Sequence, residues 1–226
     1  MVEQPASASD YVDVLLVGQT GVGKSTVINM IRGVQEGSNG SAEVKNDVRP
    51  CTVSARDYRT TLDGREFRLW DTRGLDEALE HPNNSDQAVG WLRRVLRMVP
   101  ACDRELKDHC QRVLNDRPST LLIWCIDASK ISIPAHWQQF RKVYVDFCGR
   151  RVAPAVVVTR VPQNWTVDWK GKCKEQLEKL GLGLEIRDDL FAGVVRHPRS
   201  YASTRMYDTD SQTAVRNVVL SWNSNR

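Results

Sequence analysis

The stretch GQTGVGKST, residues 18–26, directly follows the apolar run 14–17 and limits what this chain can fold into. Its spacing of glycines, lysine and serine is that of a loop that wraps a polyphosphate with backbone N–H groups. Gly21 and Gly23 leave room for the phosphates, Lys24 brings a positive charge to them, and the Ser25 hydroxyl is a ligand for Mg2+. We therefore predict a phosphate site, with Lys24 also catalytic, at Gln19, Thr20, Gly21, Val22, Gly23, Lys24, Ser25 and Thr26.

Apolar strands alternate with amphipathic helices along most of the chain. We predict strands at 11–17, 121–127, 152–159 and 191–195, and helices at 24–32, 89–99, 102–114, 137–147, 170–180 and 215–222. Two further strand-like runs, 57–62 and 66–71, are joined by Asp63-Gly64, which is a strong hairpin signal. Continuous apolar strands are typical of a parallel sheet with both faces covered. The sequence thus predicts a three-layer α/β fold, mostly parallel, with one antiparallel hairpin strand.

A second motif, LWDTRGL at 69–75, lies at the end of the third predicted strand. We predict that Asp71 holds Mg2+ directly or through water. The Gly74 N–H is predicted to contact a γ-phosphate, and this contact would be lost when the phosphate is hydrolysed. Thr52 lies just after the long polar loop 33–50 and is our candidate for closing on Mg2+. We predict Ser25, Thr52 and Asp71 at the metal and Lys24, Thr52 and Gly74 in catalysis. An ordinary turn at Asp71 and an ordinary loop threonine at Thr52 are the alternatives.

Composition narrows the class of protein. With 226 residues, of which 41% are hydrophobic, the chain suits one domain, which we place at 11–222 between flexible ends 1–10 and 223–226. The net charge of +4 comes from scattered basic residues, so we expect no nucleic-acid partner. The longest apolar runs, 121–126 and 152–158, are too short to span a bilayer. Six irregularly spaced cysteines and no apparent signal peptide favour reduced thiols and a cytoplasmic location.

The sequence resembles the P-loop GTPases in GQTGVGKS, in CT at 51–52 and in DTRGL. It looks most like the septin and immunity-associated branch, and especially like small single-G-domain proteins of fungi. This finer resemblance is carried by VINMI, LWDTRGL, LLIWCIDASKI and FCGRRVAPAVVVT and covers most of residues 11–222. It implies a G domain that binds GTP or GDP with Mg2+ and switches through loops around 33–55 and 72–85. Its similarity to septins also implies a homodimer through the nucleotide face; the protein effector is unknown.

The resemblance weakens at the motif with which the family recognises the guanine base. The family pattern there is Asn/Thr-Lys-x-Asp, whose aspartate accepts from the guanine N–H groups. Thr159 and Arg160 fit the first two positions and are predicted to bind nucleotide, the Arg160 stem by stacking on the base. Pro162 stands in place of the carboxylate, and Gln163 or Asn164 would be a weak substitute. The segment around Ala202 and Ser203 faintly resembles the loop that contacts the guanine O6.

The catalytic pattern also departs from that of Ras-like proteins. Leu75 stands where those proteins place a glutamine that orients water, so we expect slow hydrolysis that needs a group from elsewhere. Arg73 is either an internal arginine finger or, as we favour, a solvated side chain. Two alternatives stay open: a degenerate G domain that binds nucleotide with little turnover, and an ATP-using P-loop protein.

Overall fold

A computed structural model describes residues 11–42, 55–72, 74–75, 101–116, 119–195 and 208–223. Within these residues, six strands form one sheet in the order β2-β3-β1-β4-β5-β6. β1 (Val12–Gly18) pairs in parallel with β3 (Arg65–Asp71) and β4 (Thr120–Asp127). β4 pairs in parallel with β5 (Ala153–Val161), and β5 with β6 (Phe191–Val195). The predicted fold class is confirmed.

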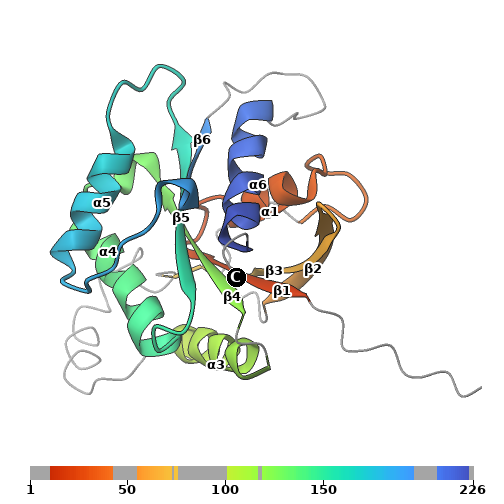
Figure 1. The fold of residues 1–226 in the computed structure, drawn as a ribbon, viewed down its shortest axis with the longest axis horizontal. Coiled ribbons are helices and arrows are strands. Elements are labelled where there is room, and N and C mark those ends of the chain that lie inside the picture. Colours follow the sequence, from red (N-terminus) through yellow and green to blue (C-terminus); the bar gives the residue numbers. More distant parts are fainter. Residues whose placement is uncertain are drawn as a thin grey trace, which may run out of the picture.

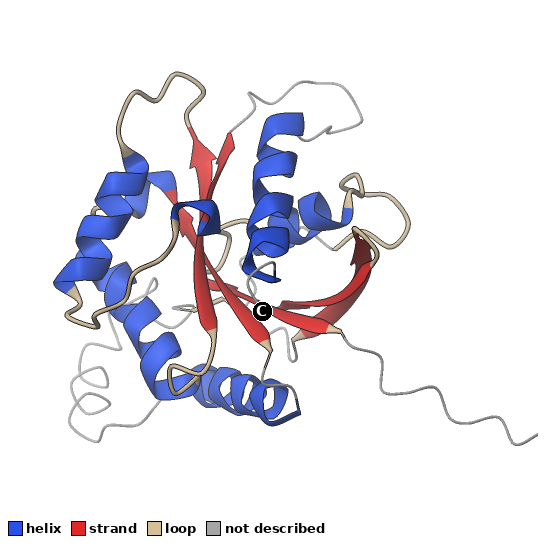
Figure 2. Cartoon of the chain, in the orientation of Figure 1, coloured by secondary structure: helices blue, strands red, loops and turns tan. Residues whose placement is uncertain are grey.

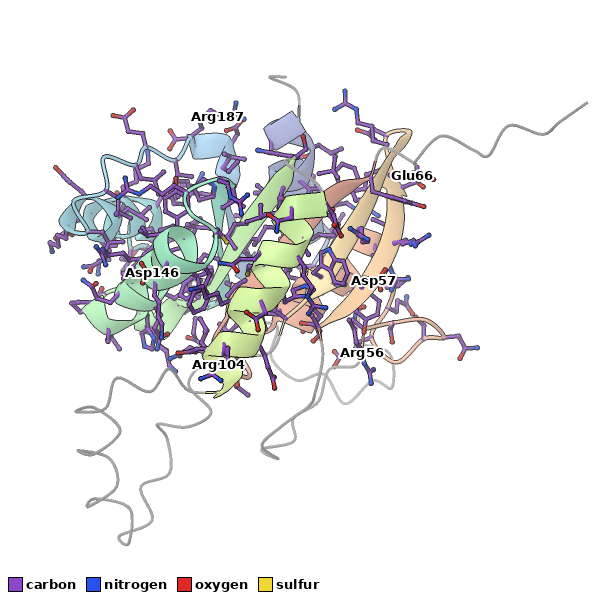
Figure 3. The ribbon with its side chains drawn as sticks, turned by 90° about the horizontal axis from the view of Figure 1, so that it is seen from below. Arg56, Asp57, Glu66, Arg104, Asp146 and Arg187 are labelled. Carbon is purple, nitrogen blue, oxygen red and sulfur yellow. The ribbon has the colours of Figure 1, made fainter. Side chains whose placement is uncertain are left out.

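The only antiparallel pair in the described sheet is the predicted hairpin. β2 (Arg56–Leu62) runs back along β3, and Asp63 and Gly64 make the turn with φ of 48° and 75°. Positive φ at both central residues is what a tight two-residue hairpin turn requires. Figure 3 labels Arg56 and Asp57 on the edge strand β2 and Glu66 on β3, and all three are exposed. The register sets Arg56 opposite Asp71, so an arginine of the edge strand lies beside the predicted metal ligand.

Helices cover both faces of the sheet, as Figures 1 and 2 show. One face carries α1 (Lys24–Arg32) and α6 (Thr209–Asn223). The other carries α3 (Ala101–Asp116), α4 (Pro134–Arg141) and α5 (Trp169–Lys179). Because both faces are covered, β1 and β4 are buried along their whole length. The predicted helix at 89–99 lies outside the described residues.

The aromatic stripe of the predicted helix 137–147 is part of the core. Trp137 and Phe140 are fully buried, and the Phe140 and Tyr144 rings stack with centroids 5.6 Å apart. The helix is not regular throughout: after α4 it continues as a π-helical segment, η2 (Lys142–Phe147). The Cys148 N–H bonds to the Val143 carbonyl at 2.9 Å, which is the wider i→i+5 spacing.

The carboxyl ends of β1, β3, β4 and β5 meet at one edge of the sheet, since these strands are parallel. Ligands of open α/β sheets bind beyond that edge. Short 3-10 turns follow β4 and precede β6, as η1 (Ala128–Lys130) and η3 (Asp188–Leu190). Over the described part of the chain, no helix combines the length and the apolar character that a membrane span needs.

Candidate functional site

The loop between β1 and α1 has the backbone that its glycines allow. Gly21 and Gly23 have φ of 71° and 98°, a region that residues with a β-carbon avoid. A β-carbon on Gly18 would overlap the Cys125 carbonyl oxygen of β4. Gly23 caps α1 without a side chain, so the first N–H groups of the helix face the loop. This is the arrangement of a phosphate-binding loop at a helix N-terminus.

Lys24 lies inside this loop. Its Nζ donates to the carbonyl oxygens of Gly18 at 3.2 Å and Gln19 at 3.0 Å, and the residue is only 7% exposed. The ammonium group is therefore held at the rim of the loop by the loop's own backbone. Its positive charge adds to the positive end of the α1 dipole at the same place.

Ser25 and Asp71 come together, although they are far apart along the chain. The Ser25 hydroxyl donates to Asp71 Oδ2 at 2.6 Å, which joins the start of α1 to the end of β3. Burial raises the pKa of the Asp71 carboxyl, and the Ser25 hydrogen bond and the charges of Lys24 and Arg56 offset this only in part. A partly buried carboxylate and a hydroxyl are hard oxygen donors of the kind that Mg2+ takes.

Gly74 and Leu75 bring the second motif against the phosphate loop. A β-carbon on Gly74 would lie 2.5 Å from both Cα and N of Thr20, so only glycine fits this approach. The Leu75 N–H donates to the Gly18 carbonyl at 3.1 Å, and Leu75 pairs with Gln19 as a parallel bridge beyond β3. Leu75 is 6% exposed. Its side chain therefore belongs to the core and not to the space where water would attack a phosphate.

Thr159, near the end of β5, is hydrogen-bonded to the phosphate loop. Its hydroxyl donates to the Val22 carbonyl at 2.7 Å and approaches the Ile126 carbonyl at 3.4 Å, and the residue is 3% exposed. Its methyl group would be 3.7 Å from a β-carbon on Gly23. The predicted base-site threonine thus contacts the phosphate loop itself.

Arg160 bridges the phosphate loop to the end of β4. Its backbone has φ of 56°, an uncommon value for a residue with a side chain. Its guanidinium donates to the Gly21 carbonyl at 2.5 Å and to Asp127 Oδ2 at 2.7 Å. Although burial opposes it, hydrogen bonds from Ser129 and Arg160 hold the pKa of Asp127 below its ordinary value. Asp127 therefore stays ionised and fixes the guanidinium over the loop.

Some predicted site residues lie outside the described residues: Thr52, Arg73, Ala202 and Ser203. Pro162 is exposed in the turn after β5, and its carbonyl accepts from the Trp165 N–H at 3.0 Å. Gln163 and Asn164 are exposed in the same turn.

Residues 13–160 match the family model described as "50S ribosome-binding GTPase". The chain belongs to this GTPase family. The match takes in the phosphate loop, the second motif and the threonine and arginine at the end of β5, so the P-loop GTPase prediction is confirmed at the level of the family. Among curated proteins, the sequence has no significant match.

Solved structures of similar fold include three of Toc33 from Arabidopsis thaliana. A variant described as dimerisation-deficient aligns with a TM-score of 0.57 at 14% identity, over 96% of this chain and 86% of Toc33. The complex with GDP and Mg2+ aligns with a TM-score of 0.53 at 15% identity, over 96% and 86% of the two chains. The complex with Mg2+ and GMPPNP gives 0.53 at 15% identity, over 96% and 87%. At these identities the likeness establishes the fold of the G domain.

Two polar residues of this G domain were not predicted for the site. Asp127 ends β4 and binds Arg160, and Lys130 of η1 donates from Nζ to Gln19 Oε1 at 2.7 Å. Asp127 is the last residue of the buried strand β4 and Lys130 follows it closely. This position was the signal that could have identified both residues, because the site lies beyond the carboxyl ends of the strands. Cys125, also on β4, has a pKa raised by burial to about 12, so its thiol stays neutral.

Proposed function

We propose that this chain binds GTP with Mg2+, hydrolyses it slowly to GDP and acts as a nucleotide-dependent switch or assembly module. The observation that carries the proposal is the hydrogen bond of 2.6 Å between Ser25 and Asp71, beside the buried Lys24. It joins the two motifs that a GTPase needs on either side of the metal and the phosphates. Membership of the GTPase family supports the same conclusion.

The oxygen donors present suit Mg2+. Ser25 would supply a hydroxyl and Asp71 a carboxylate, directly or through water, and Thr52 is the proposed third ligand. A cation here would offset the burial that raises the pKa of Asp71. Ser25 and Asp71 would hold a bound Mg2+, which would supply positive charge to offset that of the phosphates. Toc33 has been crystallised with Mg2+ and either GDP or GMPPNP, which supports the same pairing of ligands in this fold.

The phosphate loop has separate tasks for its residues. Backbone N–H groups from Gln19 to Thr26 would surround the α- and β-phosphates, and Lys24 would leave its carbonyl partners to meet the β- and γ-phosphates. Gly74 lies against Thr20, and its N–H is the proposed contact for a γ-phosphate. Loss of that phosphate would release the segment that follows.

Hydrolysis is proposed to be slow because Leu75 is buried and apolar. The water-orienting group would then come from a partner or from a second copy of the chain. A homodimer through the nucleotide face, as the resemblance to the septin and immunity-associated branch implies, would supply it. One of the Toc33 structures is that of a dimerisation-deficient variant, which supports a dimer as an arrangement open to this fold.

A second candidate function is nucleotide binding without turnover. The burial of Leu75 and the commitment of its N–H to Gly18 favour this alternative. Phosphate release by the purified protein at saturating GTP and Mg2+ separates the two candidates. Release above the rate of a Lys24→Ala variant identifies a GTPase, and equal rates identify a binding module.

Lys24→Ala tests the binding proposal itself. The ammonium makes charge-assisted hydrogen bonds that are worth about 1.5–3 kcal/mol each, so GTP affinity should fall by about 100-fold in calorimetric titrations. Lys172→Ala, which removes an exposed lysine of α5, is the matched control and should bind as the wild type does. A folded Lys24→Ala variant of unchanged affinity would remove the basis of the proposal.

A further inference from the structure

A second lysine contacts the phosphate loop, in addition to Lys24. Lys130 of η1 donates from Nζ to the side-chain oxygen Oε1 of Gln19 at 2.7 Å, while Lys24 donates to the backbone carbonyl of the same residue at 3.0 Å. Two ammonium groups are thus held on one residue of the loop. We propose that Lys130 is a further phosphate-binding residue, whose Nζ leaves Gln19 to donate to the terminal phosphate of GTP. The inference rests on the nucleotide binding proposed above.

The charge of Lys130 is held by a neutral group. None of the ion pairs between described residues includes Lys130, and its acceptor is the uncharged amide oxygen of Gln19. Arg160, the other cation at this loop, is instead paired with the carboxylate of Asp127. A hydrogen bond to an ionised acceptor is about twice as strong as one to a neutral acceptor. A phosphate oxygen within reach would therefore displace the amide as the partner of Lys130.

The backbone that carries Lys130 is fixed on both sides. Before it, Asp127 accepts from the N–H of Ser129 at 2.9 Å and from its hydroxyl at 2.7 Å. After it, Ile131 is 2% exposed, and its carbonyl accepts from the Trp137 ring N–H at 2.8 Å. The lysine side chain is a flexible four-carbon stem. Transfer of Nζ from the amide to a phosphate therefore requires rotation of this side chain and no movement of η1.

The place of Gln19 in the loop favours the terminal phosphate as the new partner. Gln19 pairs with Leu75 of the second motif as a parallel bridge. The preceding residue, Gly74, lies against Thr20, and its N–H is the proposed contact for the γ-phosphate. Leu75 is buried and brings no polar side chain to this part of the site. Lys130 would supply positive charge there, on the side of the loop that the second motif approaches.

The test compares a triphosphate with a diphosphate. GMPPNP keeps a terminal phosphate but resists hydrolysis, so its affinity and that of GDP can both be measured by calorimetric titration with Mg2+. Lys130→Met removes the charge and keeps an unbranched side chain. GMPPNP affinity should fall by about tenfold or more, the value of one charge-assisted hydrogen bond. GDP affinity should change by less than about twofold, because GDP lacks the phosphate that this bond requires.

Three further variants separate the charge of Lys130 from its tie to Gln19. Lys130→Gln keeps N–H donors for the Gln19 amide oxygen but has no charge, so it should lose GMPPNP affinity as Lys130→Met does. Lys130→Arg keeps the charge and should lose less. Lys172→Met removes an exposed lysine of α5 and should bind both nucleotides as the wild type does. Thermal melting checks that each variant is folded, and Lys130→Gln gives the same comparison if Lys130→Met is not.

The possible outcomes are distinct. Unchanged GMPPNP affinity in both neutral variants overturns the inference and leaves the proposed function intact. Equal losses for GMPPNP and GDP, or wild-type affinities restored by Lys130→Gln, also overturn it, because they show that Lys130 only holds the loop through Gln19. A wild-type protein that binds neither nucleotide overturns the proposed function together with the inference.

Discussion

Thr159 allows a sharp test of how the phosphate loop is held in place. Its hydroxyl donates to the Val22 carbonyl at 2.7 Å in a setting that is 3% exposed. Thr159→Val keeps the shape of the side chain but takes this donor away from the carbonyl. Thr159→Ser keeps the donor but removes a buried methyl group. The two variants therefore separate the hydrogen bond from the packing at one position.

The expected losses of stability are similar. Leaving a buried carbonyl without its donor costs about 1–3 kcal/mol in the free energy of unfolding. Removing one buried methyl group costs about 1 kcal/mol. Urea denaturation without nucleotide should therefore show both variants destabilised by an amount of the same order, and stability alone will not distinguish them.

Nucleotide affinity should distinguish them. In Thr159→Val the loop is no longer tied to β5, so binding must also order it; an ordering cost of about 1.4 kcal/mol weakens GTP binding about tenfold. Thr159→Ser should bind GTP as the wild type does, because the serine hydroxyl reaches the same carbonyl. Calorimetric titration measures both. Equal affinities for the two variants would refute the idea that this hydroxyl positions the loop.

Two further outcomes follow from the buried groups of the site. The folded-state pKa of Asp71 is raised, so the stability of the nucleotide-free protein is highest below the unfolded pKa of this carboxyl and falls as pH rises through the folded pKa. Asp71→Asn should therefore raise the free energy of unfolding at pH 7, measured in urea. The same variant should weaken Mg2+-dependent GTP binding at least about tenfold. A lower free energy of unfolding would contradict the raised pKa of Asp71. Leu75→Gln should lower the free energy of unfolding by about 2–4 kcal/mol without accelerating phosphate release, since the amide enters a buried position. Faster release would show that the side chain faces the phosphates.

The parts of the fold that could be predicted are those that depend on residues close together in the sequence. The helix after the phosphate loop begins and ends at the predicted residues 24 and 32, and β6 spans the predicted 191–195. The hairpin followed from Asp63-Gly64 because its turn geometry depends on those two residues. The π-helical segment after α4 was not predicted, since its wider hydrogen bonds leave no mark on the spacing of the apolar residues.

The contacts that the sequence did not predict join residues distant along the chain. Arg160 was expected to stack on a base, yet the structure also binds it to Gly21 and Asp127, which no local pattern around Arg160 could indicate. Leu75 was interpreted only as the lack of a water-orienting glutamine. Its burial and its bond to Gly18 depend on the register between β1 and β3, which continues one bridge past the end of β3. Such features require the assembled sheet.

The two ends of the nucleotide site therefore differ in how easily they can change. The phosphate end is one continuous loop whose glycines, lysine and serine act through local geometry, and Asp71 is added by a single neighbouring strand. The predicted base end depends on the turn after β5, where Pro162 stands in place of the carboxylate of the family pattern. Affinity that comes from phosphates and Mg2+ can persist when the base is no longer read.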